Sequence, residues 1–137
     1  MSFQNRYKRS ACGSSLNGIG SLPSKRPSKR LEDIIENIDV IREYTVDMDF
    51  HAYLADRRTM DATERCLLRI SEAAIKLGDF AEEQMPDVDW RGIRGIGNAI
   101  RHAYDQLEPK AIWAIVTTKL EPLSVATSGA LTRLGAE

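Results

Sequence analysis

Residues 57–77 read RRTMDATERCLLRISEAAIKL, and their apolar positions recur with an unusually regular helical spacing. Alternating steps of three and four residues separate six small or apolar side chains: Met60, Thr63, Leu67, Ile70, Ala74 and Leu77. This spacing is typical of a narrow coiled-coil seam, which packs along one neighbouring helix or along a partner subunit. Gly78 follows directly and is the kind of residue that ends a helix. The segment therefore predicts one long helix that stops at Gly78.

The sequence before this helix shows the same period. In LEDIIENIDVIREY, residues 31–44, five aliphatic side chains share one stripe: Leu31, Ile34, Ile35, Ile38 and Ile41. Ser28 is a candidate N-cap for this helix. Residues 46–56 link the two helices and can form a short helical turn. After Gly78, the segment DFAEEQM predicts one more short helix before Pro86.

The sequence after Pro86 predicts two further helical segments. Asp89 can cap a helix that runs from Trp90 to about Tyr104, where DQLEP interrupts it. KAIWAIVTTKLEPL, residues 110–123, restarts the pattern, and Pro122 should kink or interrupt this last helix. No segment has a convincing strand period, and the sequence contains no internal repeat. The expected fold is an all-α, up-and-down bundle of four or five helices.

Length and composition indicate a single globular domain. The chain has 137 residues, of which 42% are hydrophobic and 28% are charged, as in ordinary soluble proteins. Its longest apolar runs are only a few residues, far short of the roughly 20 that span a bilayer. A membrane role is therefore not expected.

The net charge of −1 conceals a division along the chain. Residues 1–30 hold seven Lys or Arg and no acid, whereas the other 107 residues hold 12 basic and 20 acidic residues. We expect a basic, disordered arm over residues 1–27 and the helical bundle domain over residues 28–137. The arm suits nucleic-acid or partner binding, but its Ser, Gly, Pro and Lys bias equally suits a disordered leader. It lacks the apolar core of a secretory signal.

The cysteines and histidines do not form a recognisable pattern. Cys12 and Cys66 give no disulfide framework, so reduced thiols in the cytoplasm are expected. His51 and His102 have no metal-ligand spacing relative to each other or to the cysteines. We therefore expect neither a metal ion nor a cofactor.

The segment from Trp90 to Tyr104 contains no acidic residue and concentrates the polar chemistry. Projected at about 100° per residue, one half of this helix gathers Arg91, Arg94, Asn98, Arg101 and His102, flanked by Trp90, Gly97 and Tyr104. The opposite half carries Ile93, Ile96, Ala99, Ile100 and Ala103, and is the expected core face.

The polar half suits phosphodiester chemistry. Guanidinium groups bind phosphate oxygens and stabilise charge that develops on phosphorus. An imidazole that titrates near neutrality can exchange the proton of a ribose hydroxyl. Gly97 marks a close approach, either by a neighbouring backbone or by an RNA strand. Taken alone, these residues form either an anion site or an ordinary solvated helix surface.

Four segments in the same order and spacing resemble the HepT-like toxins of the HEPN superfamily: RLEDIIENIDVI, ISEAAIKL, PDVDWRGIRGIGNAIRHAYDQ and AIWAIVTTKLEPL. The resemblance covers residues 28–131. It implies an all-α bundle that dimerises, with paired clefts at the dimer interface. It also implies a metal-independent endoribonuclease encoded beside an MNT-type minimal nucleotidyltransferase that acts as its antitoxin.

The family motif is an arginine, four to six residues, a histidine, one residue and a tyrosine. His102 and Tyr104 match its end, and Asn98 matches the asparagine that usually follows the motif arginine. The arginine position itself is Gly97, so this chain departs from the pattern there. Arg101 is the nearest arginine on the helical face. The resemblance further implies that Tyr104 is the site of AMPylation by the antitoxin.

The leading hypothesis is therefore the toxin component of a bacterial toxin–antitoxin system, acting as a metal-independent endoribonuclease on RNA. His102 is the expected general acid/base, Asn98 orients it or the phosphate, and the phosphate-binding residues are Arg91, Arg94 and Arg101. One alternative is a catalytically weak relative that binds nucleic acid or the nucleotidyltransferase through the same face. Another is a helical dimerisation module without a ligand. We expect a homodimer that uses the 60–77 seam and the Trp90–Tyr104 face.

Overall fold

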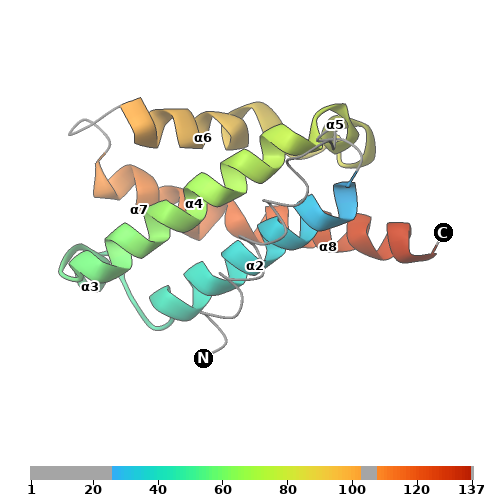
Figure 1. Ribbon diagram of the computed structural model, residues 1–137. Coiled ribbons are helices and arrows are strands. Elements are labelled where there is room, and N and C mark those ends of the chain that lie inside the picture. Colours follow the sequence, from blue (N-terminus) through green and yellow to red (C-terminus); the bar gives the residue numbers. More distant parts are fainter. Residues whose placement is uncertain (1–25, 103–107, 137) are drawn as a thin grey trace.

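The computed structural model describes residues 26–102 and 108–136, and every regular element in these two ranges is a helix (Figure 1). The elements are α2 (Pro27–Thr45), α3 (Phe50–Leu54), α4 (Arg57–Leu77), α5 (Asp79–Gln84), α6 (Trp90–His102), α7 (Pro109–Thr118) and α8 (Leu120–Ala136). The all-α prediction is confirmed, as are the two short helices α3 and α5. The N-terminal arm up to residue 25 lies outside the described residues.

The long helices alternate in direction. In Figure 1, α2 and α6 run one way, whereas α4 and the consecutive pair α7 and α8 run the other way. Helix α4 packs against both α2 and α6, and α2 also packs against α8. The up-and-down bundle expected from the sequence is therefore confirmed. None of the described helices is long and apolar enough to cross a membrane.

The seam of α4 packs inside the single chain. Four of its side chains, Leu67, Ile70, Ala74 and Leu77, are almost fully buried. They join the aliphatic stripe of α2, where Leu31, Ile34, Ile38 and Ile41 are also fully buried, in one core cluster. The spacing allowed the seam to pack against either a neighbouring helix or a partner subunit, and in the structure it packs against a neighbouring helix. The expectation that this seam forms a dimer contact is therefore wrong, because α2 already covers it.

The helix ends follow local chemistry. The Asp56 carboxylate caps α4 by accepting hydrogen bonds from the Thr59 backbone N–H (3.1 Å) and hydroxyl (2.8 Å), and the backbone bond chiefly lowers the pKa of Asp56. Gly78, with a φ of 58°, ends α4 as predicted. The prediction that Ser28 caps α2 is wrong. The cap position is Arg26, and the helix begins at Pro27, two residues earlier than a cap at Ser28 implies; there the missing N–H of proline costs no hydrogen bond.

Pro122 interrupts the last helical segment, as predicted. Because proline has no N–H, it cannot donate to the carbonyl of Thr118, four residues earlier. Helix α7 ends at this threonine, and α8 begins at Leu120. The break divides the segment into two helices that remain in contact with each other.

Candidate functional site

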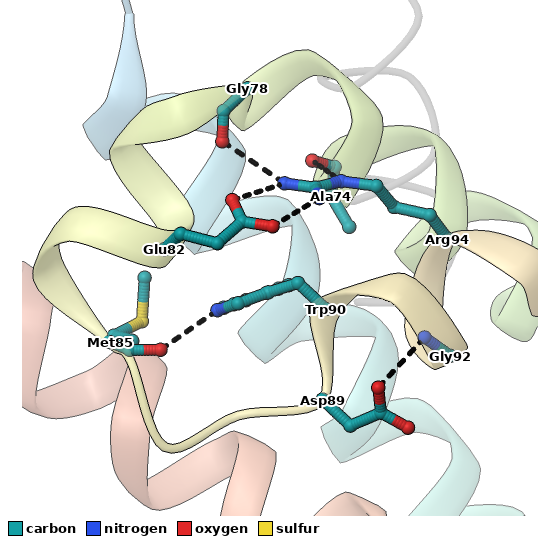
Figure 2. Close-up of polar contacts among 8 residues, drawn as sticks. All are labelled: Ala74, Gly78, Glu82, Met85, Asp89, Trp90, Gly92 and Arg94. Carbon is teal, nitrogen blue, oxygen red and sulfur yellow. Dashed lines mark hydrogen bonds and ion pairs between the residues drawn. The ribbon is translucent and has the colours of Figure 1, made fainter.

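Helix α6 is fixed at its N-terminal end by three polar contacts (Figure 2). The Asp89 carboxylate accepts a hydrogen bond from the Gly92 N–H at 3.1 Å, which confirms its predicted role as the cap. The Trp90 indole is 2% exposed and donates from Nε1 to the Met85 carbonyl at 3.0 Å. Arg94 provides the third contact, to the C-terminal end of α4 and to α5.

The Arg94 guanidinium is surrounded by acceptors. Nε donates to the Ala74 carbonyl at 3.2 Å, and Nη2 donates to the Gly78 carbonyl at 3.0 Å. In addition, Nη1 donates to Glu82 Oε2 at 2.6 Å and Nη2 donates to Glu82 Oε1 at 3.0 Å. The hydrogen bond from Arg94 chiefly lowers the pKa of Glu82, and the same bond raises the pKa of Arg94. The structure thus places this predicted phosphate ligand in a contact between helices.

Gly97 is buried against α4, where it meets Ser71. The Ser71 hydroxyl donates to the Arg94 carbonyl at 2.8 Å and accepts from the Gly97 N–H at 3.1 Å. A Cβ atom at position 97 would lie 2.6 Å from the Ser71 Oγ. The close approach expected from this glycine therefore comes from a neighbouring helix within the chain.

The core face of α6 is rotated from the one that the sequence predicted. Trp90, Ile93 and Gly97 are buried, whereas Ile96 and Ile100 are half-buried and Ala99 is exposed. The buried side is displaced by about a quarter turn from the centre of the aliphatic half. The predicted core face is confirmed for Ile93, is confirmed in part for Ile96 and Ile100, which pack against the core, and is wrong for Ala99; Ala103 lies outside the described residues. An open apolar groove of about 250 Å³ lies between α6 and α7, lined by Gly92, Gly95, Ile96, Ala99, Ile112 and Ile115.

The last turns of α6 bring together three of the predicted site residues. Asn98, Arg101 and His102 are all exposed there, and Asn98 and His102 are four residues apart, so they share a face. Arg91 is exposed in the first turn, about 16 Å from His102 along the helix axis at 1.5 Å per residue. Tyr104 lies outside the described residues. Within the described ranges, no three His, Cys, Asp or Glu side chains gather as a candidate metal site.

Beside Arg101, the structure reveals a pocket that the sequence did not predict. It lies between α4 and α6, has a volume of about 220 Å³, and is lined by Arg65, Leu68, Arg69, Glu72 and Arg101. Arg101 Nη1 lies 3.8 Å from the Glu72 carboxylate. The i, i+4, i+7 spacing of Arg65, Arg69 and Glu72 places them on one face of α4. Only tertiary packing could show that this face meets the end of α6.

Comparison with known proteins identifies the class of this chain. Residues 34–128 match the family described as Ribonuclease HepT-like. The chain belongs to this family of helical ribonucleases, as the four motifs and the bundle led us to expect.

Named relatives agree with this assignment. A protein of Methanocaldococcus jannaschii named "Putative RNase MJ0127" is 33% identical over 99 residues, which are 72% of this chain and 82% of the relative. "Probable ribonuclease HepT" of Thermococcus cleftensis is 30% identical over 93 residues, covering 68% of this chain and 84% of the relative. No solved structure gives a significant match to the chain.

Proposed function

We propose that this protein is the RNA-cleaving toxin of a toxin–antitoxin pair and acts as a metal-independent endoribonuclease. Its membership of the HepT-like family supports ribonuclease activity. The observation that carries the proposal is the exposed cluster of Asn98, Arg101 and His102 at the end of α6. These side chains supply an amide, a guanidinium and an imidazole within about one helical turn.

In the proposed reaction, the ribose 2′-hydroxyl attacks the adjacent phosphorus. The new bond joins O2′ to phosphorus, and the bond from phosphorus to O5′ breaks. His102 accepts the hydroxyl proton and returns a proton to the leaving O5′, so the reaction consumes no water. Asn98, one turn before His102, orients the imidazole or the phosphate. Arg101 stabilises the negative charge on the phosphoryl oxygens.

Arg101 replaces the motif arginine that this chain lacks. Its Nη2 lies 3.5 Å from the position that a Cβ atom of residue 97 would take. The guanidinium therefore covers the place where a side chain at position 97 would leave the helix. Arg94, held by Glu82 and two carbonyls, fixes α6 on α4, and Arg91 is left to contact a more distant phosphate.

Two further parts of the proposal concern partners. We propose that two copies of the chain pair across the apolar groove between α6 and α7, where Ile96 and Ile115 remain only half-buried. Burying such surface in a symmetric contact would stabilise a dimer. An MNT-type nucleotidyltransferase is the proposed antitoxin, and Tyr104 is the proposed acceptor of AMP.

The decisive test compares the wild type with His102→Ala on a mixed-sequence single-stranded RNA, in the presence of EDTA. Cleavage by the wild type, with 2′,3′-cyclic phosphate ends, and its loss in the variant are expected. Because His102 is exposed, the variant should melt like the wild type in circular dichroism. Equal cleavage by both proteins would refute the assignment of His102. RNA binding without cleavage would favour the alternative of a catalytically weak binding module.

A further inference from the structure

The pocket between α4 and α6 contains arginines that the family motif does not include. We propose that Arg65 and Arg69 of α4, together with Arg101 of α6, bind a phosphate of the RNA backbone that flanks the cleaved bond. This inference rests on the proposed function, because it assigns part of the RNA strand to a second place on the same surface.

The charge of the lining favours an anion. Among the described residues, three guanidinium groups and one carboxylate line the pocket, and their formal charges sum to +2. Arg65 is exposed and Arg101 is 42% exposed, so a ligand can approach both from solvent. Arginine is well suited to phosphate because its planar fork donates two parallel hydrogen bonds to phosphate oxygens.

The direction of Arg101 places this phosphate beside the scissile one. Adjacent residues on a helix diverge by about 100°, so Arg101 and His102 leave α6 in different directions. Arg101 extends toward α4, with Nη1 3.8 Å from Glu72, whereas His102 is exposed in the last turn. An RNA strand that reaches from the His102 imidazole to the pocket therefore places one phosphate beside His102 and the next phosphate in the pocket, with Arg101 between them.

Glu72 provides a way to distinguish a phosphate-binding pocket from a contact that only holds two helices together. Its carboxylate is the one acidic group among the described lining residues and lies beside Arg101. A phosphate that enters must compete with this carboxylate for the Arg101 guanidinium. Replacing Glu72 with glutamine removes the competing charge, so we expect tighter RNA binding. If the arginines only held the two helices together, the same change would not strengthen RNA binding.

The test measures binding of a fluorescein-labelled, single-stranded RNA oligonucleotide to the full chain carrying His102→Ala, across a series of salt concentrations. Losing the contact with one phosphate should make the slope of log K against log[salt] shallower by about 0.7. Because the three arginines bind the same phosphate, Arg101→Gln and the double variant Arg65→Gln/Arg69→Gln should each make the slope shallower by up to about 0.7. Glu72→Gln should lower the Kd. Arg133→Gln removes the same charge from α8, where Arg133 donates to the Gln84 carbonyl, and should leave the slope unchanged.

The possible results separate this inference from the proposed function. Slopes equal to that of Arg133→Gln in all the pocket variants would overturn the subsite, even if the wild type cleaves RNA through His102. Arginine-dependent slopes without any cleavage by the wild type would support the subsite and refute the ribonuclease proposal. Melting curves of each variant show whether the fold is retained. The tighter binding of Glu72→Gln tests the pocket without removing any arginine.

Discussion

Gly97 of α6 and Ser71 of α4 lie so close together that position 97 has no room for a side chain. A Cβ atom there would meet the Ser71 Oγ at 2.6 Å and its Cβ at 3.0 Å. The departure of this chain from the family motif is thus tied to the packing of two helices. With α6 in this position, an arginine at residue 97 would have to displace α4.

Substituting Gly97 with alanine should destabilise the protein by about 1–3 kcal/mol, the usual cost of overpacking a well-packed contact. Urea unfolding, followed by circular dichroism, measures the decrease in stability. The double variant with Ser71→Ala should be destabilised by less than the sum of the two single changes, because the methyl group and the hydroxyl compete for the same space.

Gly95→Ala is the matched control on the same helix. A Cβ atom at position 95 has no neighbour within 4 Å. Alanine also has a higher helix propensity than glycine, so this variant should gain about 0.5–1 kcal/mol. Equal effects of the two substitutions would contradict the role assigned to the contact with Ser71.

The pair of Glu82 and Arg94 should make stability depend on pH. The hydrogen bond from Arg94 lowers the pKa of Glu82 in the folded state, so the folded state favours the charged carboxylate. The stabilisation is then complete above about pH 5 and disappears as the pH falls through the lowered pKa. Glu82→Gln should reduce the melting temperature at neutral pH, and its difference from the wild type should vanish in acid. Glu83→Gln, on the same short helix, should show no such convergence.

Arg94→Lys should reveal whether Arg94 anchors α6 or binds RNA. A lysine ammonium cannot reproduce the planar contacts with Glu82 and the Ala74 and Gly78 carbonyls. The free energy of unfolding should fall by about 1–3 kcal/mol, as when hydrogen bonds to a charged group are removed. The salt dependence of RNA binding should stay unchanged in the folded variant. Because lysine keeps the positive charge, Arg94→Gln is the variant that tests the slope of log K against log[salt], and a shallower slope in it would instead place Arg94 among the phosphate-binding residues.

The oligomeric state should depend on the groove between α6 and α7. Ala99 is exposed and lines this groove, so Ala99→Asp should leave the fold intact while placing a charge at the proposed interface. Sedimentation velocity at micromolar concentration should show a dimer for the wild type and a monomer for this variant. Ile75→Asp, at an isoleucine of α4 that is 50% exposed, should remain a dimer. A monomeric wild type would refute the proposed pairing.

Tyr104 should control the activity through modification. Incubation with an MNT-type nucleotidyltransferase and ATP should add AMP to Tyr104 and abolish RNA cleavage, because the new phosphate competes for Arg101. Mass spectrometry of the wild type and Tyr104→Phe locates the adduct. An equal amount of AMP adduct in Tyr104→Phe would show that another residue is modified. The absence of any adduct in the wild type would favour inhibition by binding of the nucleotidyltransferase alone.

The sequence by itself determined the helical architecture, because local periodicity and capping residues report on it directly. The spacing of residues 57–77, the stop at Gly78, the cap at Asp89 and the break before Pro122 all depend on neighbours within one or two turns. These predictions are confirmed for that reason. The cap predicted at Ser28 was wrong because Pro27 can occupy the first helical position and start α2 two residues earlier than that cap implies.

Only the tertiary structure decided which faces of the helices meet. Apolar periodicity defines a stripe on α6, but the buried side follows Trp90 and Gly97 because α4 offers Ser71 and backbone carbonyls at that point. The same packing holds Arg94 in a contact with the end of α4. It also brings Arg65 and Arg69 beside Arg101. Arg69 and Arg101 are 32 residues apart in the sequence. Such a pairing depends on the rotation and offset of two packed helices, which the period of either helix alone does not contain.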